Sequence, residues 1–370
     1  MKIIITGGGT GGHIYPGISL AKALQKKNSE NKIIFVGTNR GMEAELVPRE
    51  GFQLYPIKVK GVQRRMCLEN FYAILLFLGS LVSSFKLIRR FQPDLVIGTG
   101  GYVSSSVALV SSLMGIPTYL HEQNALPGIT NKFLSLTCRK VFISFPGSKD
   151  YFYKKNKTVY YGNPVRENIW KGKRERLISQ TNLKTKKKTI LVFGGSKGAA
   201  VINHTFLSCL NKIDETFWNQ WQVLMISGKE DYRNIIDRIS QGRFSEIVAV
   251  LPYSYEIEDA YDIADLVLCR AGATTVAELT AKGLPAILVP YPYATGNHQL
   301  YNARFLEQKN AAVVIIEKEL SEKKLAEVLS EMIKNEKKRN KIAQNSKMTG
   351  KREASDNIIQ YIYDDLKNLK

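Results

Sequence analysis

The feature that most constrains the fold is a repeated unit, in which a short apolar run leads into glycine and then into a helical pattern. Residues 3–6 (IIIT) run into Gly7-Gly8-Gly9, and residues 17–27 follow with apolar positions at helical spacing. Further strand-like runs occupy residues 32–38, 94–102, 117–124 and 140–144. Apolar strands that alternate with helices are typical of a parallel sheet covered on both faces. The first half therefore predicts an α/β domain.

The same unit starts again after a pause, which predicts a second domain. The pattern stops near residues 161–164, and we interpret the basic stretch 171–188 as a solvated loop. Strand-like runs resume at 189–196, 222–228, 246–253, 265–273, 285–292 and 313–317. A chain of 370 residues also exceeds the usual domain size of about 100–200 residues. We expect an α/β protein with two doubly wound domains that face a cleft, the first ending near residue 163.

Three glycine-rich loops follow strands in this pattern, at residues 7–12, 98–104 and 194–199. Such a loop lets the backbone approach a phosphate at the N-terminus of the next helix. The first loop contains GxGxxG, but a dinucleotide site also needs an acid near the end of the second strand. That strand ends in VGTNR (36–40), without an acid, which argues against NAD. Each loop alone is compatible with a packing turn, whereas two phosphate-rich ligands explain all three.

The charge balance indicates a polyanionic partner. The chain has 53 Lys and Arg against 33 Asp and Glu, a formal charge of +20. Nucleic acid, anionic lipid and phosphate-bearing substrates all satisfy this excess. No nucleic-acid recognition motif is present in the sequence, so we expect no nucleic-acid partner. Four widely spaced cysteines and an N-terminus without a signal-peptide pattern predict a reduced, cytosolic protein.

Residues 66–91 raise the question of a membrane. The apolar core from residue 71 to residue 82 is shorter than the roughly 20 residues that a spanning helix needs. Basic residues flank it: Arg64, Arg65, Lys86, Arg89 and Arg90. A short apolar helix with basic edges suits the interface of an anionic bilayer. A buried core helix is the other interpretation.

Seven segments, in order along most of the chain, carry a specific resemblance. They are GGGTGGHIYPG (7–17), GTGGYVS (98–104), LHEQNALPG (120–128), GNPVR (162–166), GGSKGA (194–199), CRAGATTVAEL (269–279) and NHQLYNA (297–303). On these segments the sequence resembles the MurG family of UDP-N-acetylglucosamine transferases. The resemblance implies the GT-B architecture of two Rossmann-like domains. It also implies transfer of GlcNAc from UDP-GlcNAc, with inversion, to the 4-hydroxyl of MurNAc in undecaprenyl-diphosphate-MurNAc-pentapeptide.

The resemblance also implies an organisation for this chain. Residues 1–163 would bind the lipid-linked muramyl-pentapeptide and an anionic membrane surface, with a C-terminal helix of about 346–370 packed back on them. Residues 164–345 would bind UDP-GlcNAc. The protein would act peripherally at the cytoplasmic face of the cell membrane. No Asp-x-Asp follows a strand, so we expect neither a metal nor another cofactor, with protein donors and a helix dipole facing the diphosphate.

The donor site is expected to draw on several of these segments. Glu278 would accept both ribose hydroxyls, Arg166 and Ser196 would face the diphosphate, and Asn124 and Gln299 would read the sugar hydroxyls. The simpler reading is an N-terminal helix charge for Glu278, a solvated surface charge for Arg166, and an ordinary turn residue or cap for Asn124 and Gln299. The remaining donor candidates are Thr10, Gly11, Gly12, Ser254, Ala273, Thr274, Thr275, Val276 and Ala277. The segment around Ser254 matches the family less well, and the role of His298 beside Gln299 stays open.

Displacement at the sugar C1 needs a base for the acceptor hydroxyl. His13, at the end of the first glycine loop, is the main candidate, because histidine can take up a proton at neutral pH. Glu122 is the alternative base and His121 a weaker one, while a packed histidine under the helix start is the simpler reading of His13. Gly100, Gly101 and Tyr102 would meet the acceptor diphosphate. The membrane patch would comprise Phe71, Ile74, Leu75, Leu78, Arg89 and Arg90.

Two other functions remain compatible with parts of the sequence. A transferase with a different lipid acceptor, such as diacylglycerol, would keep the fold, but the muramyl-lipid motifs in the first half count against it. A UDP-GlcNAc 2-epimerase would share the two-domain fold without an acceptor, and residues 66–91 count against it. We therefore expect the lipid-linked GlcNAc transferase.

Overall fold

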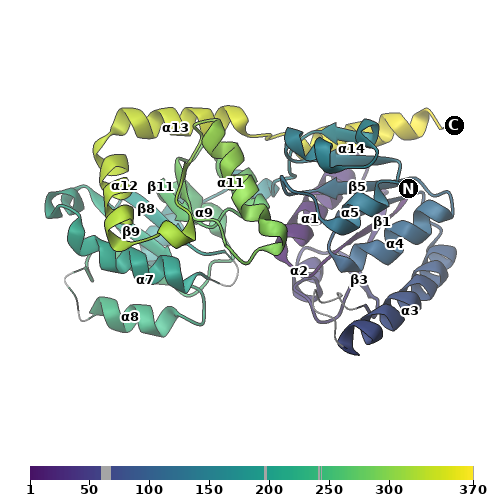
Figure 1. Ribbon diagram of the computed structural model, residues 1–370, viewed down its shortest axis with the longest axis horizontal. Helices are drawn as coiled ribbons and strands as arrows, with labels where there is room; N and C mark the ends of the chain where they lie inside the picture. The colour runs from purple at the N-terminus through teal and green to yellow at the C-terminus, as the bar shows by residue number, and fades with distance from the viewer. Residues whose placement is uncertain (60–67, 196–197, 241, 243, 370) are drawn as a thin grey trace. The chain divides into compact units, whose positions relative to one another are not determined.

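The computed structural model describes residues 1–59, 68–195, 198–240, 242 and 244–369 (Figure 1). The chain forms two compact units. Unit 1 contains Met1–Arg166 together with Lys351–Lys370, and unit 2 contains Glu167–Gly350. Ser196, Arg64 and Arg65 from the sequence predictions lie outside the described residues, as does the side chain of Phe71.

The sheet of unit 1 is parallel throughout, with the strand order β3-β2-β1-β4-β5-β6-β7. The strands are β1 (Lys2–Gly7), β2 (Lys32–Gly37), β3 (Gln53–Pro56), β4 (Leu95–Gly100), β5 (Thr118–Glu122), β6 (Lys140–Ile143) and β7 (Thr158–Tyr160). The order reverses between β1 and β4. Ligands of doubly wound sheets bind beyond the carboxyl ends of the strands at such a reversal.

Helices cover both faces of this sheet, as its apolar strands require. They are α1 (Gly11–Lys27), α2 (Glu43–Arg49), α3 (Leu68–Phe91), α4 (Tyr102–Leu113), α5 (Ile129–Leu134) and α14 (Ala354–Lys367). Ile3 and Ile5 of β1 face a core shared with α1 and α14, whereas Ile4 faces a core shared with α3 and α4. Helix α1 begins at Gly11, inside the glycine loop, six residues before the predicted helical stretch.

Helix α3 turns its large apolar side chains outward. Its buried positions carry Ala73, Ser80, Ser84 and Ile88, and Ser84 Oγ lies 3.3 Å from Ser106 Oγ of α4. The exposed positions carry Tyr72, Ile74, Leu75, Leu78, Val82 and Phe85. The apolar stretch is also longer than the predicted core: Tyr72–Phe91 has the length and hydropathy of a membrane span, although a core helix passes the same test. The predicted length was therefore wrong.

The sheet of unit 2 is also parallel, with the order β10-β9-β8-β11-β12-β13 and a reversal between β8 and β11. The strands are β8 (Lys188–Phe193), β9 (Trp221–Ile226), β10 (Val248–Leu251), β11 (Ala264–Cys269), β12 (Ala286–Leu288) and β13 (Val313–Val314). The helices are α6 (Arg174–Gln180), α7 (Ala200–Cys209), α8 (Tyr232–Ser240), α9 (Ile257–Ile263), α10 (Ala273–Lys282), α11 (His298–Gln308), α12 (Glu322–Lys334) and α13 (Glu336–Thr349). The predicted α/β class with two doubly wound parallel sheets is confirmed.

The basic stretch 171–188 was predicted as a solvated loop, and this was wrong for its first half. Residues Arg174–Gln180 form α6, whose Leu177 is buried. Arg176 Nε lies 2.7 Å from the buried carboxylate of Asp259 on α9, and Lys173 N–H donates to the same carboxylate. One charge of this stretch, that of Arg176, and the backbone N–H of Lys173 therefore anchor the helix to α9.

Candidate active site

The first glycine loop of unit 1 is held by a buried carboxylate. Gly9 N–H donates to Glu43 Oε2 at 3.0 Å, and the backbone N–H and hydroxyl of Thr38 donate to Glu43 Oε1 at 3.0 and 2.7 Å. Burial alone would raise the pKa of Glu43, but these hydrogen bonds outweigh it and lower the pKa. Sequence reasoning missed Glu43, because it searched for an acid at the end of the second strand and Glu43 opens the next helix.

His13 lies in the first turn of α1, where the ends of β4 and β5 meet it. Its Nδ1 atom lies 3.1 Å from the carbonyl oxygen of Thr99 and 3.0 Å from Gln123 Oε1. A Cβ atom on Gly100 would lie 2.9 Å from the same Nδ1, so only glycine lets the chain pass this close. The described residues give Nε2 of His13 no hydrogen-bond partner. The structure thus joins the first two glycine loops around one imidazole.

The residues at the end of β5 and directly after it have two roles. His121 and Gln123 are linked to His13, whereas Glu122 between them holds a turn. His121 is fully buried, with Nε2 3.2 Å from the Gly162 carbonyl and Nδ1 3.0 Å from Gln123 Nε2. Burial lowers the pKa of His121 to about 4, so its imidazole is neutral. Gln123 links His121 to His13. It was missed by the sequence reasoning, although it stands inside the HEQN segment.

Glu122 points the other way and holds a turn. Its carboxylate accepts hydrogen bonds from Asn124 N–H (3.0 Å), Gly128 N–H (3.1 Å) and the Asn131 side chain (2.8 Å). It is 2% exposed. A carboxylate with these internal donors orders the backbone that carries Asn124, and its oxygens are already occupied by hydrogen bonds within the turn. His13 is therefore the stronger candidate for the base.

The second glycine loop forms the start of α4. Gly101 caps the helix at φ +79°, and a Cβ atom there would lie 2.5 Å from the Gly8 carbonyl oxygen. Tyr102 follows, 39% exposed, and burial together with the charge of Glu43 raises its pKa. Gly100, Gly101 and Tyr102 thus lie with His13 at the switch point of the sheet, beside a helix N-terminus that favours anions.

Arg166 lies beside the start of α1. Its guanidinium carbon is 4.4 Å from the ring centre of Tyr15, a cation–π distance. Thr10 caps the same helix in an extended conformation, and Gly11 and Gly12 form its first turn. Arg166, Thr10, Gly11 and Gly12 therefore lie with His13 at the N-terminal end of α1.

In unit 2 the predicted donor residues gather at the start of α10. Gly272 caps this helix, and Ala273, Thr274, Thr275, Val276 and Ala277 form its first half. Thr274 Oγ1 is buried and, among the described residues, has no hydrogen-bond partner. Glu278 is 3% exposed, and its Oε2 accepts a 3.0 Å hydrogen bond from the hydroxyl of Tyr261. Tyr261 on α9 carried no sequence motif and was missed.

Helix α11 braces the loop before α10. Gln299 Oε1 accepts hydrogen bonds from the N–H groups of Ala271 (3.2 Å) and Tyr291 (3.0 Å), and Asn302 Nδ2 donates to the Ala271 carbonyl (3.1 Å). Because its oxygen serves these two donors, the NH₂ group of Gln299 is directed elsewhere. His298 Nδ1 lies 2.8 Å from the Thr295 carbonyl oxygen, which leaves its role open.

Ser254 lies after β10, between Tyr253 and Tyr255, whose ring centres are 4.8 Å apart.

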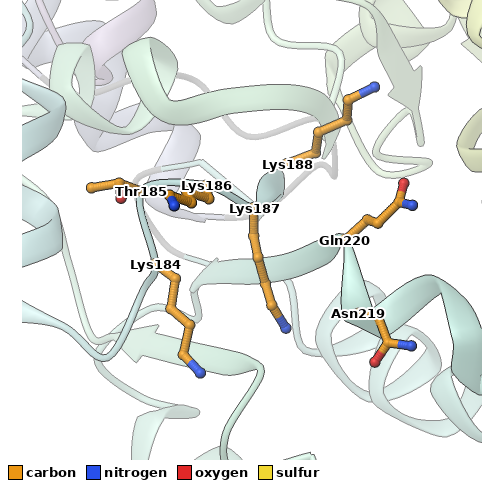
Figure 2. A pocket seen from close by; sticks show the side chains of 7 residues that line it. All are labelled: Lys184, Thr185, Lys186, Lys187, Lys188, Asn219 and Gln220. Atoms are coloured by element: carbon orange, nitrogen blue, oxygen red, sulfur yellow. The ribbon is translucent and has the colours of Figure 1, made fainter.

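The cavity in Figure 2 lies at the amino ends of β8 and β9. It is lined by Lys184, Thr185, Lys186, Lys187, Lys188, Asn219 and Gln220. The predicted residues lie at the carboxyl ends of the strands, so this cavity is not their site. In the described part of the chain, no three His, Cys, Asp or Glu residues form a metal-type cluster.

Comparison with known proteins gives a consistent match over the whole chain. Residues 3–143 match the glycosyltransferase family 28 N-terminal domain, and residues 189–358 match its C-terminal domain. The UDP-N-acetylglucosamine–N-acetylmuramyl-(pentapeptide) pyrophosphoryl-undecaprenol N-acetylglucosamine transferase of Acetivibrio thermocellus is 42% identical over 370 residues, covering 100% of this chain and 99% of the relative. The enzyme of the same name from Pediococcus pentosaceus is 38% identical over 369 residues, covering 100% and 99%.

Solved structures share the fold. The crystal structure of MurG from Acinetobacter baumannii has a TM-score of 0.77 at 26% identity, covering 98% of this chain and 99% of that one. A UDP-GlcNAc 2-epimerase from Neisseria meningitidis, bound to UDP-GlcNAc, has a TM-score of 0.71 at 15% identity, covering 98% and 100%. The second likeness concerns the fold alone.

Proposed function

This chain belongs to the MurG family within glycosyltransferase family 28, and from this premise we propose how its residues carry out the reaction. The protein transfers GlcNAc from UDP-GlcNAc to the undecaprenyl-diphosphate-linked muramyl-pentapeptide, a step of peptidoglycan synthesis. Its architecture is GT-B, as the resemblance predicts. The observation that carries the function is the 42% identity to the named transferase over its full length.

The donor binds in unit 2 at the start of α10. The first-turn N–H groups face the diphosphate, where negative charge grows as UDP leaves. So does the hydroxyl of Thr274, which has no partner within the described part of the chain. Glu278 accepts the ribose hydroxyls, and the NH₂ group of Gln299 donates to a hydroxyl of GlcNAc. Ser254 lies on the side of the uracil base of UDP. Ser196 and Arg166 add donors for the diphosphate, and no metal takes part in this scheme.

The acceptor binds in unit 1, at the carboxyl ends of β1, β4 and β5. The N-terminus of α4, with Gly100, Gly101 and Tyr102, faces the acceptor diphosphate. His13 takes the proton from the 4-hydroxyl of MurNAc as that oxygen attacks C1 of GlcNAc. We prefer His13 to Glu122 because the carboxylate of Glu122 is committed to Asn124, Gly128 and Asn131.

Helix α3 brings the protein to the cytoplasmic face of the membrane. Ile74, Leu75 and Leu78 are each about half exposed, and Arg89 and Arg90 are exposed at the end of the same helix. Apolar side chains enter the headgroup region while the arginines bind anionic lipid, which is the design of a peripheral anchor. Phe71 completes the proposed patch.

The test of the function is transfer of radiolabelled GlcNAc from UDP-GlcNAc into the muramyl-pentapeptide lipid, in the presence of EDTA. We expect label in the lipid phase, which supports both the acceptor and the metal-independent scheme. Label that appears only when Mg²⁺ replaces EDTA contradicts that scheme. Label that enters diacylglycerol but not the muramyl lipid contradicts the acceptor, and release of UDP without any lipid supports the epimerase.

The anchor has a separate test. Replacing Ile74, Leu75 and Leu78 with serine should weaken binding to vesicles that contain anionic lipid, while activity on a soluble acceptor analogue is retained. Met348→Ser, at a 67% exposed position on α13, is the control for loss of an exposed apolar side chain. Unchanged vesicle binding of the triple variant would contradict the anchor.

A further inference from the structure

A line of hydrogen bonds runs from a backbone carbonyl to His13. The Gly162 carbonyl oxygen lies 3.2 Å from His121 Nε2, His121 Nδ1 lies 3.0 Å from Gln123 Nε2, and Gln123 Oε1 lies 3.0 Å from His13 Nδ1. His121 and Gln123 are buried. The proposed chemistry uses only the last residue of this line, so the other two need an explanation.

The direction of the line follows from its first member. A carbonyl oxygen can only accept, so Nε2 of His121 carries a hydrogen atom. His121 is neutral, because burial lowers its pKa to about 4 and outweighs the bond to Gly162. Its Nδ1 atom is therefore a bare acceptor, and the side chain of Gln123 must turn its NH₂ group towards it.

The same direction continues to His13. With its NH₂ group on His121, Gln123 presents Oε1 to His13, which must then carry a hydrogen atom on Nδ1. The Thr99 carbonyl gives an independent check: it accepts from Gln123 Nε2 at 2.6 Å and lies 3.1 Å from His13 Nδ1. Both neighbours of Nδ1 are acceptors. In neutral His13 the lone pair is therefore on Nε2.

The surrounding charges do not disturb this arrangement. Tyr102 at the start of α4 and Glu43 on α2 lie beside the glycine loop, near Gly9 and Gly8, and Arg166 lies over the Tyr15 ring on α1. The carboxylate of Glu43 faces the N–H groups of Gly9 and Thr38. Glu122, the neighbour of both His121 and Gln123, is bonded to the turn on the opposite side of the strand. His121 is the one imidazole in contact with Gln123 besides His13 itself, among the described residues.

We propose that Gln123 and His121 are positioning residues that hold His13 in the tautomer with hydrogen on Nδ1, so that Nε2 receives the proton of the acceptor hydroxyl. This inference rests on the proposed role of His13 as the base. The hydroxyl oxygen forms its bond to C1 of the sugar, its proton moves to Nε2, and the C1–O bond to UDP breaks with the electron pair leaving on the diphosphate. The resulting imidazolium donates from Nδ1 to Gln123 Oε1, which stabilises it.

The tautomer can be read without any reaction. The chain has four histidines, so ¹⁵N-histidine labelling gives four imidazoles, which His13→Gln and the corresponding single substitutions assign. We expect the neutral ring of His13 to carry its hydrogen atom on Nδ1, with Nε2 bare, and the ring of His121 to show the opposite pattern. A His13 ring protonated on Nε2 alone, or a His121 ring protonated on Nδ1, would overturn the inference.

The kinetic arm uses Gln123→Met, which keeps the size of the side chain and removes the acceptor. We expect kcat at neutral pH to fall roughly tenfold, with the KM of both substrates within about threefold of the wild-type values. The acidic limb of the kcat–pH profile should move to lower pH, because the imidazolium loses a hydrogen bond. Gln222→Met is the matched control: Gln222 is equally buried, in unit 2, and is bonded to Lys184 and Thr189.

The outcomes separate this inference from the proposed function. If His13→Ala keeps a near-normal kcat, the base assignment fails, whatever the tautomer. If His13→Ala is inactive but Gln123→Met keeps both the wild-type kcat and the wild-type pH profile, the positioning role fails and the base stands. A loss of kcat in Gln123→Met without movement of the profile, matched by Gln222→Met, would also overturn the positioning role.

Discussion

The starts of α1 and α10 share a strand–loop–helix setting and differ in whether their polar groups already have hydrogen-bond partners in the described structure. Each follows a strand and a glycine-containing loop. Around α1, Gly9 N–H is bonded to Glu43 and His13 is bonded towards Thr99 and Gln123. At α10, the hydroxyl of Thr274 is buried and unpartnered in the described structure. In the function we propose, the first helix start positions His13 and the second presents donors to an anion.

This difference shows that a glycine loop before a helix does not by itself identify a phosphate site. The carboxylate of Glu43 already provides the negative charge that the amides of the first loop favour. Glycine serves there for close approach, since a Cβ atom on Gly8 would lie 2.5 Å from Glu43 Oε1. Three substitutions and a change of pH should separate the two helix starts, with effects that decrease from His13 to Thr274.

The largest effect is expected at the start of α1. His13→Ala should lower kcat by about 10²–10⁴-fold, because a general base typically contributes this much. Steady-state kinetics with both substrates measures it. His204→Ala, on α7 of unit 2, is the control, and its kcat should stay near the wild-type value. A His13 variant with a near-normal rate would remove the reactive residue from the comparison.

Acid should destabilise unit 1, which contains His121, more than unit 2. The pKa of His121 is about 4 in the folded chain and about 6.5 in an unfolded one, so only the unfolded state gains a proton as the pH falls from 6.5. Its contribution to stability is complete above pH 6.5 and is lost towards pH 4, by about 3 kcal/mol. Hydrogen exchange should show protection falling more in unit 1 than in unit 2. His121→Gln should reduce that difference, and an equal response of both units in the wild type would contradict the prediction.

On α10, Glu278→Ala should raise the KM for UDP-GlcNAc by roughly 10–100-fold, the expected loss for hydrogen bonds to a charged group. Initial rates at saturating acceptor measure it. Tyr261→Phe removes only the internal hydrogen bond to Glu278 and should change the KM by less than about fivefold. If the KM of the Glu278 variant is normal, the carboxylate serves α9 and α10 rather than the donor.

The smallest effect is expected at Thr274. Thr274→Val keeps the shape and removes a hydroxyl that has no partner among the residues that the structure describes, so the donor KM should rise about 2–10-fold with no loss of thermal stability. Thr280→Val, on the same helix, gives the reverse pattern, since its hydroxyl donates to the Val276 carbonyl. If the Thr274 variant loses stability without a change in KM, the hydroxyl of Thr274 serves the fold, as the polar groups at the start of α1 do.

The sequence predicted the architecture because the strands are continuous apolar runs, which only a covered parallel sheet can bury. The sequence pattern placed the start of α1 too late. A proline normally lies in the first turn of a helix, whereas Pro16 lies inside α1. The pattern also missed β3 and β7, two short edge strands with half-exposed residues. Period and hydrophobicity specify a sheet centre more strongly than its edges.

The candidate site was less accessible to the sequence. Motifs indicated His13, Gly100 and Glu278, but their partners Glu43, Gln123 and Tyr261 come from elements distant in the sequence. The contact between His13 and Gln123 spans 110 positions, and no local pattern records it. Glu122 shows the converse: a motif acid whose carboxylate is used to hold a turn.

The return of the chain to unit 1 has a consequence for its synthesis. Residues Lys351–Lys370 complete that unit: α14 packs on α1, and Asp365 binds the hydroxyl of Tyr119 and the guanidinium of Arg139. During translation, unit 2 is finished before unit 1 has its last helix. Domains usually fold in the order in which they emerge from the ribosome. Here unit 1 begins first but receives α14 only after unit 2 has been synthesised, so the core shared by α1 and α14 stays uncovered until then.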